Sequence, residues 1–184
     1  TLVNMSAHPT VLESENLVYS SDYAGYLRLA LAKELGGTAI FINGVVGDME
    51  PTVDERGVES AQKYGFDVAE TIINNLKNHS APLGNKLQFK TKAFKHSIVN
   101  PWILGALSAN LLDLDVNDQS EIDVEYTIMT LGRATIVLVP GEALSGTMQP
   151  IKDKLNSQYE MTFGLANGSL GYFIPSAEYG TVPD

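Results

Sequence analysis

The sequence predicts an α/β fold, with one mixed β-sheet covered by helices. Short apolar runs typical of strands alternate with helical patterns in the first and last thirds of the chain. The middle third contains strand-like runs whose pattern favours antiparallel pairing. With 184 residues, 44% of them hydrophobic, the chain can bury the core of one domain.

The first third of the chain is predicted to form two strands and two helices. Ser20, Ser21 and Asp22 are capping residues for the first helix, and Gly36 and Gly37 follow its last turn. The apolar residues of each helical segment fall on one face, and the second strand is β-branched and apolar, as in a buried strand. The expected elements are a strand at 2–7, a helix at 23–35, a strand at 38–43 and a helix at 58–76.

The rest of the chain is predicted to form four strands and two helices. Lys90, Lys92 and Lys95 interrupt an apolar pattern, which indicates a half-exposed strand at the edge of a sheet. A turn-rich connection with Pro82 and Gly84 precedes it. The expected elements are strands at 86–96, 122–132, 134–139 and 161–166, with helices at 102–112 and 142–155.

The charge of the chain limits its partners. Its 12 Lys and Arg residues against 22 Asp and Glu residues give a net charge of −10, which excludes nucleic acid as an expected partner. Apolar runs fall short of the roughly 20 residues that span a bilayer, so we expect no transmembrane segment. The absence of cysteine excludes disulfides and thiolate ligands, but it does not determine the compartment.

Polar clusters directly follow four of the strand-like runs. They are His8-Pro9-Thr10, residues 47–51, Pro140-Gly141-Glu142 and residues 167–172. In an open α/β sheet, residues just past the carboxyl ends of strands converge on one crevice, where ligands bind. An imidazole, carboxylates and a phenol in one crevice favour a hydrolytic metal site.

Each of these residues also has a structural interpretation. His8 lies before a proline that restricts the backbone, but a lone histidine is more often structural than a ligand. The turn containing Gly47 and Asp48 would let the backbone approach a ligand, yet such turns are also common connections. At the start of a predicted helix, Glu142 is favoured as a capping residue on local grounds.

The most acidic segment, residues 113–125, partly matches a calcium-binding loop. Asp113, Asp115 and Asn117 occupy the first ligand positions, but Asp118 stands where the loop needs glycine and Val124 where it needs glutamate. A solvated loop is therefore expected, and a calcium-binding or adhesive module is the weakest of the functions considered. His79 and His96 are predicted to be surface residues.

Taken together, five segments resemble the catalytic domain of the neutral ceramidase family. In chain order they are residues 4–10, 20–26, 41–51, 139–142 and 164–172, with Glu178 and Tyr179 following. The resemblance is weak between about residues 77 and 129. It implies a zinc-dependent amidase that cleaves the N-acyl bond of ceramide-like lipids, so a small-molecule or lipid substrate and a secreted or periplasmic location are expected.

The resemblance also implies a ligand set. In that family the zinc ion is held by two histidines, a glutamate and a tyrosine. In this chain, His8 matches the second histidine, Glu142 the glutamate and Tyr172 the tyrosine. The first histidine would precede Thr1, so residues 1–184 are expected to be a domain fragment truncated at both ends. The residues expected to bind substrate are Asn43, Gly47 and Asn167.

One departure from the family affects the chemistry. Where the family has Gly-Asp-Val-Ser-Pro, with a serine central to catalysis, this chain has Gly47-Asp48-Met49-Glu50-Pro51. Glu50, or Asp48 beside it, could act as general base on a metal-activated water. Glu50 could equally mark a changed substrate or a lost activity. The alternative to an enzyme is therefore a non-catalytic relative that binds a lipid or glycan in the same crevice.

Overall fold

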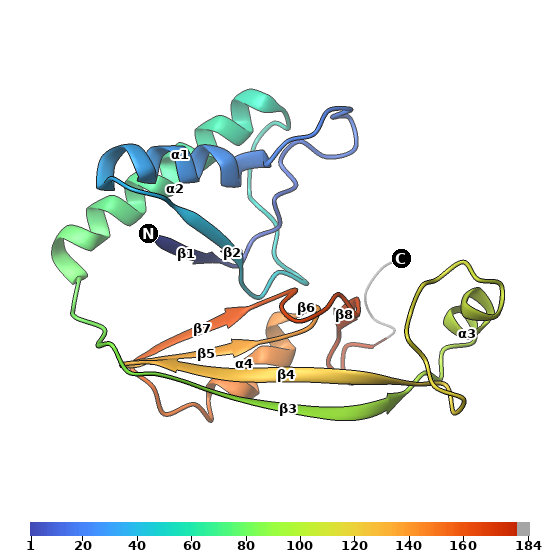
Figure 1. Cartoon of the computed structure of the whole chain (residues 1–184). Helices are drawn as coiled ribbons and strands as arrows, with labels where there is room; N and C mark the ends of the chain where they lie inside the picture. The colour runs from blue at the N-terminus through green and yellow to red at the C-terminus, as the bar shows by residue number, and fades with distance from the viewer. Residues whose placement is uncertain (180–184) are drawn as a thin grey trace.

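Two long helices pack together over the first pair of strands. In the computed structural model, which describes residues 1–179, strand β1 (Leu2–Met5) pairs in parallel with β2 (Ile40–Asn43). Helices α1 (Asp22–Leu35) and α2 (Val58–His79) lie side by side above this pair (Figure 1). The predicted strands and helices of the first third are confirmed, apart from small differences at their ends.

The helix pair is held by large buried side chains and one close backbone approach. Tyr23, Leu27 and Leu31 of α1 are fully buried against α2. At Gly65 of α2, a Cβ atom would lie 2.5 Å from the carbonyl oxygen of Tyr23. Only glycine fits there, so Gly65 sets how closely the helices approach.

The main sheet is mixed, as predicted. Its strand order is β3 (Leu87–Ser97), β4 (Glu121–Leu131), β5 (Ala134–Leu138) and β7 (Tyr159–Phe163). The first two neighbouring pairs are antiparallel, whereas β5 and β7 are parallel. Strand β3 forms an edge and is exposed along its whole length, which its lysines suit. Helix α3 (Pro101–Ser108), capped by Asn100, stands beyond the far end of β3 and β4 (Figure 1).

Side-chain and backbone hydrogen bonds join the first strand pair to the main sheet. The Nδ2 atom of Asn4 donates to the carbonyl of Thr162 over 2.7 Å, and the backbone N–H of Gly164 donates to the carbonyl of Asn43 over 2.9 Å. The ends of β2 and β7 therefore lie next to each other. This junction brings the polar segments that follow the strands to one region.

The last predicted helix, at 142–155, was wrong at its start. Glu142 and Ala143 form a short strand, β6 (Glu142–Ala143), and helix α4 begins only at Ser145 and ends at Lys152. Strand β6 pairs in parallel with β8 (Tyr172–Phe173), which the sequence did not predict. The pairing also removes the capping interpretation of Glu142, because its backbone N–H donates to the carbonyl of Gly171 instead of starting a helix.

Two further features concern exposure. Strand β2 is not the buried strand that was predicted, because Ile40 is 52% exposed at the end of a sheet of only two strands. In the described part of the chain, none of the helices is both long and apolar enough to cross a membrane.

Candidate active site

His8 and Glu142 meet at the centre of the site. The Nε2 atom of His8 lies 3.1 Å from Oε2 of Glu142, and both side chains are about four-fifths buried, with exposures of 19% and 20%. His8 follows β1, and its backbone N–H donates to the carbonyl of Met49 over 2.9 Å. Two segments that are far apart in the sequence therefore present an imidazole and a carboxylate to each other.

The helix α1 residue Tyr23 holds the backbone just before His8. Its hydroxyl donates to the carbonyl of Ala7 over 2.6 Å, and its side chain is fully buried. Burial, followed by the charges of Tyr64 and Asp22, raises the pKa of this phenol above its usual range. A phenol that stays neutral keeps its proton for the bond to Ala7, which stabilises the position of His8.

Tyr172 lies beside Glu142 because the two residues are direct partners in the β6–β8 pairing. Burial raises the pKa of the Tyr172 phenol, as do a hydrogen bond to Glu142 and the charges of Glu142 and Glu50. The structure thus brings together the three residues expected as metal ligands. Their role as ligands remains a prediction.

Gly47 explains how the loop after β2 approaches β6. Its backbone N–H donates to the carbonyl of Ala143 over 3.0 Å. A Cβ atom at this position would lie 2.8 Å from the side chain of Leu144 and 2.9 Å from the backbone of Ala143. The glycine therefore allows protein backbone to pack closely, and a contact with substrate remains a prediction.

Asp48 is engaged with the start of helix α4. Its carboxylate accepts hydrogen bonds from the backbone N–H of Ser145, over 2.8 Å, and from the Ser145 hydroxyl. A carboxylate is favourable at a helix N-terminus because the first N–H groups lack partners within the helix. These bonds hold Asp48 at the start of α4, and its role in catalysis remains a prediction.

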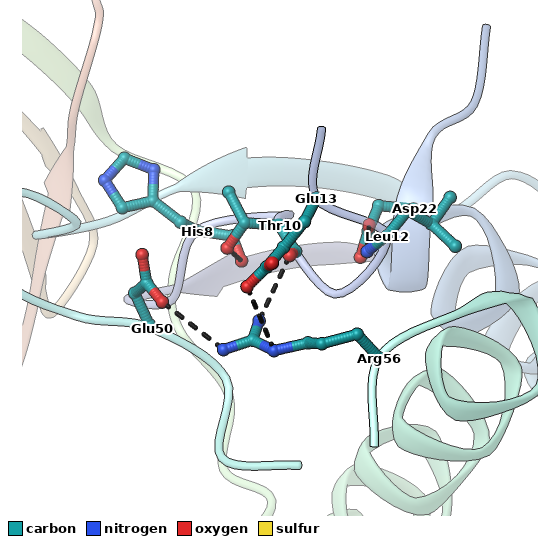
Figure 2. A network of polar contacts seen from close by, with 7 residues as sticks. All are labelled: His8, Thr10, Leu12, Glu13, Asp22, Glu50 and Arg56. Atoms are coloured by element: carbon teal, nitrogen blue, oxygen red, sulfur yellow. Dashed lines mark hydrogen bonds and ion pairs between the residues drawn. The ribbon is translucent and has the colours of Figure 1, made fainter. Parts of the chain in front are cut away.

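Glu50 belongs to a network centred on Arg56, which the sequence interpretation missed. The guanidinium of Arg56 lies 3.6 Å from Oε2 of Glu50 and 3.2 Å from Oε1 of Glu13, and it donates to the carbonyl of Thr10 over 3.1 Å. Figure 2 shows the guanidinium between the two carboxylates. In the sequence, Arg56 only looks like part of a solvated charged turn, so nothing there indicated this contact.

The two asparagines predicted to bind substrate differ in their contacts. Nδ2 of Asn167 donates to Oε1 of Glu125 and to Oγ1 of Thr127, at 3.1 and 3.3 Å, so it ties its loop to β4. Oδ1 of Asn43 is buried and, among residues 1–179, has no hydrogen-bond partner. A buried acceptor of this kind can be satisfied by a donor from a ligand.

The donor set fits a zinc ion in its chemistry. An imidazole nitrogen, a carboxylate and a phenol supply the nitrogen and oxygen ligands that zinc accepts. Oε2 of Glu142 is buried and makes no well-aligned hydrogen bond in the described part of the chain, although Nε2 of His8 lies close to it. Within residues 1–179, no three His, Cys, Asp or Glu side chains are grouped so as to hold a metal ion.

Two cavities of different character adjoin these residues. One, of about 640 Å³, lies between the loop after His8 and Glu50, and most of its lining is polar. The other, of about 400 Å³, reaches Tyr172 and Phe173 and is lined mainly by apolar side chains, including Phe94, Ile103 and Val124. The two cavities have no lining residue in common.

Neither a protein-family model nor a curated protein sequence matches the chain. Two solved structures share its fold. The neutral ceramidase from Pseudomonas aeruginosa has a TM-score of 0.69 and 13% identity, over 99% of this chain and 39% of that one. A ceramidase complexed with C2 has a TM-score of 0.70 and 12% identity, over 98% and 40%. The chain therefore has the fold found in two fifths of these ceramidases.

Proposed function

We propose that this chain carries most of the active site of a zinc-dependent hydrolase that cleaves the amide bond of an N-acyl lipid. The observation that carries the proposal is the meeting of His8, Glu142 and Tyr172, which come from three separate segments. The fold shared with ceramidases supports the substrate class, and the apolar cavity beside Tyr172 provides room for a hydrocarbon chain.

In this proposal, His8, Glu142 and Tyr172 hold the zinc together with a histidine from a segment before Thr1. Bound zinc would act as a Lewis acid, polarising the amide carbonyl and lowering the pKa of a water. The buried Oε2 of Glu142, which makes no well-aligned hydrogen bond among the described residues, would then gain a bond to the metal. The Tyr23 hydroxyl orients this set indirectly, through the backbone of Ala7.

Glu50 is the proposed general base. Its carboxylate would take a proton from the attacking water and deliver it to the amide nitrogen as the carbon–nitrogen bond breaks, so the products are a fatty acid and an amine. Arg56 would hold Oε2 of Glu50, which leaves Oε1 to handle the proton. Asn43 Oδ1 is the proposed acceptor for the substrate N–H, because it is buried and lacks a partner within residues 1–179.

The contact between Arg56 and Glu50 also favours a second candidate function, a non-catalytic protein that binds lipid in the same crevice. Arg56 lies 3.6 Å from Oε2 of Glu50, so this carboxylate already has an ion-pair partner within the chain. In that case His8, Glu142 and Tyr172 would shape a binding site without turnover.

The test is metal content together with hydrolysis of N-acyl amides by the full-length protein. We expect about one zinc per molecule after dialysis and release of fatty acid, with both reduced at least tenfold in His8→Ala and Glu142→Gln. His79→Ala, at an exposed position at the end of α2, is the matched control and should change neither. Zinc binding without hydrolysis would support the binding protein, and full zinc content in His8→Ala would exclude the ligand set.

A further inference from the structure

The cavity beside Glu50 is suited to a polar group with several hydroxyls. Hydroxyl and amide side chains line it, from Thr10, Ser14, Asn16 and Ser20, together with the carboxylates of Glu13 and Glu50. Such groups both donate and accept hydrogen bonds, as hydroxyls of a ligand do. A hydrocarbon chain placed here would separate these polar groups from water without satisfying them, which is costly.

The carboxylates that line the cavity all have donors within the chain. Arg56 contacts the carboxylates of both Glu13 and Glu50. The carboxylate of Asp22 accepts from the backbone N–H groups of Leu12 and Tyr23, over 2.8 and 2.6 Å. Because the acidic groups already have donors, the cavity favours neutral hydroxyls over a strongly cationic ligand.

Tyr19 adds an aromatic surface at the edge of this cavity. Its side chain is fully exposed, and it lines the cavity together with Val18. An exposed tyrosine offers an apolar ring face with a polar hydroxyl at its tip. This combination suits the flat C–H face of a sugar ring, whose hydroxyls can bond to the polar lining.

Each cavity is lined by a residue adjacent to the His8–Glu142 pair. Pro9, directly after His8, lines the polar cavity, whereas Tyr172, the strand partner of Glu142, lines the apolar one. A substrate whose amide lies at His8 and Glu142 would therefore extend one half into each cavity. Its acyl chain would lie in the apolar cavity, against Phe94, Val124 and Phe173.

We propose that the substrate is an amide with one long acyl chain and a polyhydroxylated amine half, such as an N-acyl amino sugar, with the amine half bound in the cavity beside Glu50. This proposal rests on the proposed function, because it assumes that the amide is cleaved at His8 and Glu142. It differs from a ceramide-like substrate in the amine half, where ceramide has a second hydrocarbon chain.

The test compares four N-lauroyl amides that differ only in the amine: glucosamine, sphingosine, hexylamine and cadaverine. For the full-length protein we expect kcat/KM to be about tenfold or more higher for the glucosamine amide than for the other three, the worth of one or two added hydrogen bonds. A higher value for the sphingosine or cadaverine amide would overturn the proposal while leaving amide hydrolysis intact.

Two variants in the polar cavity test whether its side chains contact the amine half of the substrate. Tyr19→Ala and Ser14→Ala should each lower kcat/KM for the glucosamine amide about five- to tenfold and leave the hexylamine amide unchanged. Phe89→Ala, which removes an aromatic ring that is 73% exposed on β3, is the matched control. An equal loss for both amides in Tyr19→Ala would contradict a contact with the amine half.

Calorimetric binding of the same four amides separates this proposal from the proposed function. If none is hydrolysed, the hydrolase assignment fails. A dissociation constant about tenfold lower for the glucosamine amide, lost in Tyr19→Ala, would still support the polar site. Equal dissociation constants for the glucosamine and hexylamine amides would overturn it.

Discussion

The hydroxyl of Tyr23 donates a 2.6 Å hydrogen bond to the carbonyl of Ala7, the residue before His8. A fully buried side chain of helix α1 thus determines where the segment after β1 leaves the core. This bond fixes the backbone of the residue before His8, and the backbone N–H of His8 itself donates to the carbonyl of Met49. Removing the first of these contacts should therefore affect both stability and the site.

We expect Tyr23→Phe to lower the free energy of unfolding by about 1–3 kcal/mol, because the Ala7 carbonyl loses a buried partner. Turnover of an N-acyl amide should fall severalfold with little change in the overall fold. Urea unfolding and steady-state kinetics measure the two effects. Tyr26→Phe, on the same helix and packed edge-on against Phe66, is the matched control; equal losses in both variants would argue against a special role for the Ala7 bond.

Stability should decrease in alkaline solution through Tyr23. Its pKa is raised in the folded state, so the folded protein keeps a proton that the unfolded chain releases. The resulting stabilisation is complete below about pH 10, the ordinary pKa of tyrosine, and is lost as the pH rises above it. Unfolding free energies between about pH 8 and pH 11 should fall less steeply in Tyr23→Phe than in the unmodified protein. If the unfolding free energies of the two proteins fall equally with pH, Tyr23 is not the source of the alkaline loss of stability.

Asp48→Ala is expected to destabilise the protein by about 1–2 kcal/mol, because two hydrogen bonds at the start of α4 are lost. Asp48→Asn should recover part of this loss, since its amide oxygen can still accept a bond. Asp54→Ala, in the following loop, is the control. If Asp48→Asn is stable yet loses turnover by about a hundredfold or more, the carboxylate also serves in catalysis.

Glu50→Gln should keep the fold and the zinc content but lower turnover by roughly 10²- to 10⁴-fold, the usual contribution of a positioned base. Turnover on N-acyl amides and metal content are measured together. Glu55→Gln, nearby in the sequence, should behave as the unmodified protein does. Unchanged turnover in Glu50→Gln would exclude Glu50 as the general base and leave Asp48 as the remaining candidate.

Zinc binding should depend on a segment before Thr1. A protein that includes the upstream histidine is expected to retain one zinc through dialysis, whereas residues 1–184 alone should retain much less, because a missing ligand costs affinity. Metal analysis of both forms decides this. Stoichiometric zinc in residues 1–184 would mean that the ligand set is complete without that histidine.

The sequence by itself predicted most of the secondary structure and the residues that meet in the site. Alternating and helical patterns are local, so they indicated α1, α2, β3 and the β4–β5 pair within a few residues of their observed bounds. The clusters after the strands contained His8, Glu142 and Tyr172. The resemblance to neutral ceramidases, rather than the pattern alone, selected these three as the expected ligands.

Only the tertiary structure determined the secondary structure at Glu142 and the contacts of Arg56. Residues 142–155 resemble one helix locally, but pairing with Tyr172 and Phe173, some 30 residues further on, holds Glu142 and Ala143 as a strand. Arg56 contacts Glu13 and Glu50 from a turn without any distinctive pattern. Both outcomes depend on contacts between segments that are separate in the chain, and local sequence patterns do not encode which distant partner a residue meets.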